Sequence, residues 1–406
     1  MKNKLLVMLA AAMFLALPMT ALAKINGVCS DCHTMHNSKA GAPMAQLSDG
    51  SGPSLTPFPV LLISDCVGCH ASGGADAIAD FNGSSVPQVY HTGGNDLAGG
   101  NFAYIDGTLG AGADDRKGHN VVDILSADAT LTGPPGMGRG ATMTSMHTGS
   151  AAVPNTTFTC AGNDGCHGVR NRLAGQNIDS NGTNVKLAGL SAMTGAHHYN
   201  VDGQIDATVA GADALDPASS YRFLNGAYGT EDADWQNTVG ANDHNDYYGV
   251  NGSPFTGSCT NCHAVGTSSS LTAVMTTPSH SISGFCATCH GTFHADTDSA
   301  TGSFVRHPTD YALPNQTEYA AYTAYDVNAP IARTNLTLAD NALVTPGAGT
   351  DLVACLSCHV AHGSDNAGML RFDYATMVAG GGDNTTGCFV CHTTKDSGTK
   401  TWSGLQ

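Results

Sequence analysis

Apolar residues are concentrated at the start of this 406-residue chain, and they show little periodicity after it. Residues 5–19 read LLVMLAAAMFLALPM, follow Lys2 and Lys4, and precede the small residues Ala21-Leu22-Ala23. This order predicts a signal peptide over residues 1–23, which leaves 406 − 23 = 383 mature residues. A retained membrane anchor is the alternative, but the run is shorter than the ~20 residues of a spanning helix. No second run of this kind follows, so we expect no transmembrane segment in the mature chain.

Most of the remaining chain lacks the period of a helix or a strand. Residues 74–85 (GADAIADFNGSS), 107–115 (GTLGAGADD) and 378–387 (VAGGGDNTTG) are examples. Glycine accounts for 50 residues, whereas only 12% of residues are charged and 6% aromatic. Such a chain loses much backbone entropy on folding and has few large side chains to bury, which alone points towards disorder. We therefore expect something other than side chains to supply the core.

The chain is acidic, with a formal net charge of −17. Loss of Lys2 and Lys4 with the signal peptide would make the net charge −19. Nucleic acid is disfavoured as a partner, because phosphate contacts need clustered Lys and Arg. A generic solubilising surface explains the charge.

Twelve of the fourteen cysteines form six C-x-x-C-H motifs, the attachment pattern for c-type haem. Two thiols add to the haem edge, and the following histidine binds the iron. Zinc sites and thioredoxin-like sites do not require that histidine, and a disulfide framework would not repeat the spacing six times. The six motifs are Cys29, Cys32 and His33; Cys66, Cys69 and His70; Cys259, Cys262 and His263; Cys286, Cys289 and His290; Cys355, Cys358 and His359; and Cys388, Cys391 and His392.

The last two cysteines stand in CAGNDGCH, with five residues between Cys160 and Cys166 and with His167 after them. Residues 162–165 are good turn formers, so the longer loop can bulge out while the two thiols stay together. A local disulfide is the alternative. We favour a seventh haem, because His167 stands where the other six motifs place their histidine.

The histidine count favours electron transfer over catalysis. Seven of the 18 histidines belong to motifs, so 18 − 7 = 11 remain for seven distal positions. A haem with two imidazole ligands has no open site for a substrate, and no C-x-x-C-K motif is present. The expected distal ligands are His36, His91, His119, His198, His294, His307 and His362, while His147, His197, His244 and His280 stay open.

His36 follows the motif histidine His33 by only three residues, which span at most about 11 Å. Because His33 lies on the proximal face of its own haem, His36 cannot reach the distal face of the same iron without passing round the porphyrin edge. We therefore expect His36 to bind a different haem. The same argument applies to His362 in CLSCHVAH and to His294 in CATCHGTFH.

Four stretches resemble the outer-surface multihaem cytochromes of metal-reducing bacteria that polymerise into filaments, in particular a hexahaem type. They are CSDCHTMHNS at 29–38, DDRKGHNVVD at 114–123, CATCHGTFH followed by FVRHP at 286–308, and CLSCHVAHGSDNAGMLRF at 355–372. The resemblance implies a multihaem cytochrome c fold, mostly irregular with few short helices and strands, wrapped round a stacked haem array. It also implies that His36 binds a haem of the next subunit in a homopolymer. CAGNDGCH departs from the hexahaem pattern, so we expect seven haems c.

The chain divides by haem content into a two-haem segment (24–155), a segment with the atypical site (156–250) and a four-haem segment (251–406). The expected function is electron transfer and not enzymatic catalysis. The expected location is outside the cell or at its surface, with other redox proteins and external acceptors such as metal oxides as partners. The alternatives are a periplasmic electron shuttle that does not polymerise and a multihaem oxidoreductase with one open haem.

Overall fold

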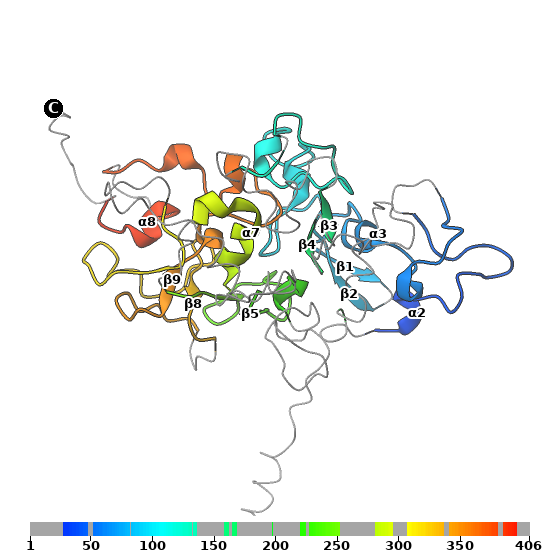
Figure 1. Cartoon of the computed structure of the whole chain (residues 1–406), viewed down its shortest axis with the longest axis horizontal. Coiled ribbons are helices and arrows are strands. Elements are labelled where there is room, and N and C mark those ends of the chain that lie inside the picture. The colour runs from blue at the N-terminus through cyan, green and yellow to red at the C-terminus, as the bar shows by residue number, and fades with distance from the viewer. Residues whose placement is uncertain are drawn as a thin grey trace, which may run out of the picture.

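The computed structural model describes residues 27–47, 52–81, 83–131, 133–135, 158–161, 165–168, 197, 220–224, 227–251, 281–294, 307–336, 341–380 and 385–395. In these ranges, short helical turns and short strands are joined by long irregular segments (Figure 1). The predicted fold, mostly irregular with few helices and strands, is confirmed. The proposed signal peptide, residues 1–23, lies outside the described ranges. Among the described helices, none has the length and apolarity needed to cross a membrane.

Each α-helix that is described over its whole length contains a C-x-x-C pair. Three of them are single turns, which are too short to be stable in isolation and depend on their surroundings. The fourth is longer and is kinked at His290, where φ is −111° and ψ is 42°. The helices are α2 (Cys29–Cys32), α3 (Cys66–His70), α7 (Ile282–His294) and α8 (Cys388–Cys391).

Short 3-10 turns supply much of the remaining local order. Several are capped by an Asn or Asp side chain that accepts a hydrogen bond from a backbone N–H, as Asp114 does from Arg116 at 2.9 Å. The turns are η1 (Pro59–Leu61), η2 (Phe102–Tyr104), η3 (Asp115–Lys117), η5 (Tyr221–Phe223), η7 (Cys355–Ser357), η8 (Ala367–Met369) and η9 (Tyr374–Thr376).

Three small sheets connect distant parts of the chain. β1 (Ile78–Phe81) pairs antiparallel with β2 (Ser84–Pro87), and β3 (Thr159–Ala161) pairs parallel with β4 (Gly165–His167). The largest sheet has the order β5-β6-β8-β9-β7 and is antiparallel except between β6 and β8. Its strands are β5 (Gly229–Thr230), β6 (Asp246–Tyr248), β7 (Tyr311–Ala312), β8 (Ala332–Arg333) and β9 (Asp351–Val353).

Buried apolar side chains form separate small clusters in the described parts of the chain. Two flank the five-stranded sheet, and a third packs against η2. None approaches the size of the core expected for a domain of this length, which agrees with a fold that needs a further apolar component. The clusters are Tyr221, Ala227, Tyr247, Ile282, Ala332, Leu352, Ala354 and Leu356; Leu313, Tyr322, Ala329, Ile331, Val344 and Val390; and Phe102, Ile105 and Val121.

The guanidinium of Arg333 joins the five-stranded sheet to the segment that follows it. Its Nη1 donates to Asp246 Oδ1 at 2.8 Å, and its Nη2 donates to the carbonyls of Asn341 at 2.6 Å and Leu343 at 2.8 Å. The group also lies 5.2 Å from the ring centroid of Tyr325. Only 1% of the Arg333 side chain is exposed, so this ion pair is shielded from water.

Replacement Arg333→Ala should therefore lower the free energy of unfolding by about 3–5 kcal/mol, because it leaves the carboxylate of Asp246 buried without its partner. Guanidinium denaturation of the haem-loaded protein, followed by tyrosine fluorescence, measures the change. The matched control is Arg116→Ala, which removes a solvent-exposed arginine paired with Asp114 and should change stability little. Equal effects of the two replacements would contradict the role given to Arg333.

Candidate haem-binding sites

The C-x-x-C spacing places both thiols of a motif on one face of a helical turn, since residues three apart are neighbours on a helix. Five of the six ordinary motifs show this arrangement in the described structure. They are Cys29 and Cys32 on α2, Cys66 and Cys69 on α3, Cys286 and Cys289 on α7, Cys355 and Cys358 at η7, and Cys388 and Cys391 on α8.

On α7, Cys289 directly precedes the kink at His290. The helix therefore changes direction between the second thiol and the histidine of this motif. The fourth motif, made of Cys259, Cys262 and His263, lies outside the described residues. That Cys259 and Cys262 attach a haem, and that His263 binds its iron, therefore stays a prediction from the sequence.

In the atypical motif, the pairing of two strands brings the two thiols side by side. Thr159 pairs with Gly165 and Ala161 with His167, so Cys160 and Cys166 occupy matching middle positions of β3 and β4. Paired strands lie about 4.8 Å apart, and residues at matching positions point to the same face. Cys160 is not in a disulfide. The longer spacing therefore presents two thiols side by side, as the described ordinary motifs do.

Each described motif histidine is oriented by a hydrogen bond from its Nδ1. The acceptor is a backbone carbonyl in five cases and a carboxylate in one, at 2.5–2.9 Å. Because these oxygens can only accept, Nδ1 carries the proton and Nε2 keeps the lone pair that binds a metal. The pairs are His33 with Val60, His70 with Pro87, His167 with Arg222, His290 with Pro135, His359 with Gly368, and His392 with the side chain of Glu318.

Four of these histidines each lie opposite a second histidine, and the distance between the two ring centroids is nearly the same in all four pairs. An iron bound to one nitrogen of each ring at about 2 Å would hold the two ring centroids roughly 6 Å apart. The observed centroid distances match this value, so the residues fit a haem iron with two imidazole ligands. They are 6.3 Å for His70 and His197, 6.0 Å for His290 and His119, 6.3 Å for His167 and His362, and 6.1 Å for His392 and His307.

His119 and His362 are held together although 362 − 119 = 243 positions separate them. His119 donates from its backbone N–H to the carbonyl of His362 at 3.0 Å and from Nδ1 to the carbonyl of Ala361 at 2.7 Å. A Cβ on Gly118 would come within 2.4 Å of the His362 carbonyl oxygen, so the close approach requires glycine at this position. We call this contact between the two segments the histidine clamp.

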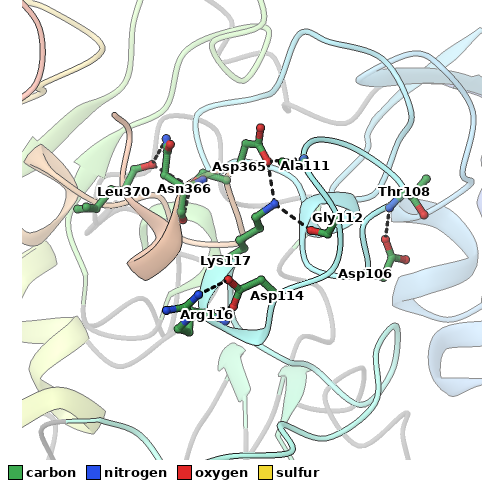
Figure 2. A network of polar contacts seen from close by, with 11 residues as sticks. Asp106, Thr108, Ala111, Gly112, Asp114, Arg116, Lys117, Asp365, Asn366 and Leu370 are labelled. Carbon is green, nitrogen blue, oxygen red and sulfur yellow. Dashed lines mark hydrogen bonds and ion pairs between the residues drawn. The ribbon is translucent and has the colours of Figure 1, made fainter. Parts of the chain in front are cut away.

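A buried lysine supports the histidine clamp from one side. Lys117 Nζ donates to Asp365 Oδ1 at 2.8 Å and to the carbonyl of Gly112 at 2.9 Å, as Figure 2 shows. Asp365 also accepts from the backbone N–H of Ala111 at 3.1 Å. Lys117 is two residues before His119, and Asp365 is three residues after His362, so the ion pair fixes both histidine-bearing segments.

The first three motifs lie next to one another. Burial, and then the neighbouring thiol of Cys32 in the first motif, raise the pKa of Cys69 in the second to about 11. Burial, and then the thiol of Cys66 in the second motif, raise the pKa of Cys160 in the third well above its usual range. The attachment sites therefore form a contiguous series from α2 to β4.

The series continues into the C-terminal part of the chain. The third and sixth motifs meet through His362, which follows the sixth motif and lies opposite His167 of the third. The histidine clamp brings in the fifth motif, because His119 lies opposite its histidine. Burial, and then the Cys388 thiol of the seventh motif, raise the pKa of Cys358 in the sixth to about 11. The six described motifs are thus connected by pairwise contacts, with the sixth motif next to the third, the fifth and the seventh.

The remaining predicted distal histidines differ in their surroundings. His36 is exposed, on the segment after α2. His91 is fully buried, and its Nε2 lies 3.4 Å from Asp96 Oδ1. His198, His147, His280 and the side chain of His294 lie outside the described residues.

Sequence reasoning missed or left open three features of these sites. His197 lies opposite His70, whereas the sequence favoured its neighbour His198, which is outside the described residues. His244 is buried, stacks on Tyr325 with ring centroids 3.6 Å apart, and bonds to the Asn245 carbonyl through Nδ1. No local pattern in the sequence points to Glu318, which lies 74 positions from its partner His392.

The thiol pairs, the oriented histidines and the paired imidazoles define a multihaem c-type cytochrome. A family model described as the doubled CXXCH motif matches residues 346–397. The chain is 27% identical over 399 residues to the C-type cytochrome OmcS of Geobacter sulfurreducens, covering 90% of this chain and 84% of OmcS. The chain is thus similar to OmcS over most of its length and carries the repeated motifs of a multihaem cytochrome c.

Two solved structures were also matched, both with a TM-score of 0.40. One is an outer membrane cytochrome S filament from Geobacter sulfurreducens, 17% identical, with 92% of this chain and 93% of that chain covered. The other is a cryo-EM structure of the OmcS nanowires from the same organism, 21% identical, with coverage of 90% and 88%.

Joint replacement of Cys160→Ser and Cys166→Ser should reduce the number of covalently attached haems from seven to six, because no thiols remain beside His167. Intact mass of the matured protein counts the haems. Joint replacement of Cys66→Ser and Cys69→Ser, which removes an ordinary motif, is the matched control and should also remove one haem. If the wild-type protein carries six haems and loss of Cys160 and Cys166 removes none, the atypical motif does not attach haem.

Replacement His197→Ala should open one haem to carbon monoxide, because it removes the imidazole opposite His70. The neighbouring replacement His198→Ala is the control and should leave every haem closed. Optical titration of the reduced proteins with carbon monoxide measures the number of binding sites. Binding by the His198 variant alone would reverse the assignment within the doublet.

Proposed function

We propose that this chain is an exported electron-transfer protein that carries seven haems c in one continuous series and assembles into an extracellular filament. The observation that carries the proposal is the connected set of six described attachment motifs, four of them with a second histidine across a gap of about 6 Å. A set connected in this way extends from one end of the described chain to the other.

In this proposal the seven cysteine pairs attach the haems, and the motif histidines hold the irons from one side. The distal ligands supported by geometry are His119, His197, His307 and His362. His36, His91 and His294 are retained from the sequence as further distal ligands, while His198 is replaced by His197. When bound, haem supplies reversible one-electron transfer between the ferric and ferrous states.

The paired imidazoles also favour a conductor over an enzyme. A reactive haem needs one axial position that a substrate can reach, whereas a histidine on each side leaves none. The chain's own contribution is to fix the rings through the Nδ1 hydrogen bonds and the histidine clamp. A multihaem oxidoreductase therefore receives no support from the four described pairs.

Assembly into filaments is supported by the surroundings of His36. The related OmcS forms nanowires according to the description of its structure, and His36 here is exposed, as a ligand for a neighbouring subunit must be. The adjacent Met35 is 88% exposed, which adds apolar surface at the same point. The function of such a filament would be delivery of electrons to acceptors outside the cell, such as metal oxides.

Replacement His36→Gly should impair filament formation while leaving all seven haems attached, because both thiols and His33 are unchanged. The variant should also contain one haem with an open axial position. Added imidazole should fill that position and restore the low-spin spectrum without restoring filaments, because it is not linked to the next subunit. Electron cryomicroscopy and optical spectra are the measurements.

Two outcomes would decide against this assignment of His36. Normal filaments of the variant, with every haem still six-coordinate, would show that His36 is not a ligand between subunits. A wild-type protein that is monomeric at all concentrations would favour the periplasmic shuttle.

A further inference from the structure

The acceptor of the Nδ1 hydrogen bond distinguishes one site from the others. Five of the six described motif histidines donate to a neutral backbone carbonyl. His392 instead donates to the carboxylate Oε1 of Glu318 at 2.5 Å. The backbone of Glu318 is held at this point by Thr393, whose N–H and Oγ1 both donate to the Glu318 carbonyl. The fold thus fixes a negative charge against the ring of His392.

We propose that Glu318 is a positioning residue that gives the haem held by Cys388, Cys391 and His392 the lowest reduction potential of the six described sites. The inference rests on the proposed electron-transfer function and deepens it. A hydrogen bond to a carboxylate makes the imidazole a stronger electron donor than a hydrogen bond to a carbonyl does. The stronger donor, together with a nearby negative charge, stabilises the ferric state over the ferrous state.

The surroundings of Glu318 and His392 only partly screen the carboxylate charge from the haem site. The side chains of Glu318 and His392 are 19% and 30% exposed, so both are partly shielded from water. Lys395 Nζ lies 3.5 Å from the other carboxylate oxygen, Oε2, but its side chain is 48% exposed. An ion pair this exposed is weak, so Lys395 offsets only part of the effect of Glu318.

The position of this site determines to which neighbouring haem it would pass electrons. The seventh motif adjoins the sixth through Cys358 and Cys388, and it stands at one end of the connected set of described motifs. Electrons move spontaneously from a haem of lower potential to haems of higher potential. A haem of lowest potential at α8 would therefore pass electrons to the neighbouring sixth site.

The test is a redox titration of Glu318→Gln in the fully matured protein. Glutamine retains an oxygen that accepts from His392 but removes the charge, and the backbone contact with Thr393 is unaffected. A component at the low end of the potential range should move to higher potential by more than any other component. Lys395→Gln should move the same component in the opposite direction and by less.

The control is Asp326→Asn, which removes a carboxylate that influences Cys391 but does not bond to His392. It should shift this component less than Glu318→Gln does. The component can be followed by electron paramagnetic resonance, because the His392 and His307 rings are 85° apart, whereas the other three described pairs are at 27–44°. Axial ring orientation changes the signal of a low-spin ferric haem, so this site should be distinct.

An unchanged low-potential component in Glu318→Gln would overturn the inference, as would an equal shift in Asp326→Asn. Intact mass must show the same haem number in every variant, so loss of a haem cannot imitate the shift. The titration uses subunits in solution and needs neither a filament nor an external acceptor. Failure of the filament proposal and failure of this inference are therefore separate results.

Discussion

The hydrogen bond from Nδ1 of each described motif histidine is the interaction on which the arrangement of the sites depends. It selects one tautomer, so that Nε2 is the nitrogen that faces the metal position. The acceptors are mostly carbonyls from segments far away in the sequence, such as Val60 for His33 and Arg222 for His167. Val60, Arg222 and Gly368 each stand at a non-helical position inside a short 3-10 turn. An interruption of the helical geometry leaves a carbonyl available to a histidine, whereas a regular helix would use it internally.

Contacts between histidine-bearing segments also explain how a chain rich in glycine adopts a defined fold. The described apolar clusters are small and separate, and the longest-range contacts join segments that carry histidines. In the histidine clamp, Gly118 permits the contact between the segments of His119 and His362, and the ion pair of Lys117 and Asp365 holds it. Because His119 and His362 lie opposite histidines of two different motifs, one backbone contact sets the relation between two sites.

The sequence predicted the attachment residues and the irregular fold, because both are local properties. A C-x-x-C-H motif fixes the thiols and the proximal histidine within five residues, and the missing periodicity is visible directly. The distal histidines, in contrast, are brought to their sites by the tertiary fold and not by a local motif. His362 lies opposite His167 and not His359, and His197 lies opposite His70. Neither result follows from spacing, since adjacent histidines in irregular backbone have no periodicity that assigns them to a face.

Glu318 is an example of a residue that affects a haem site but cannot be found from the sequence motifs. Six of the seven motifs share the C-x-x-C-H pattern, so they predict similar sites, and differences in potential among these six depend largely on residues outside the motifs. The acceptor of the histidine Nδ1 is such a residue, and it can be a carbonyl at one site and a carboxylate at another without any change in the motif. A chain of otherwise equal haem sites acquires a direction when one end differs in this way, because a potential difference along the series favours electron movement from that end towards the other. The direction would then be a property of the tertiary fold, carried by contacts between residues far apart in the sequence.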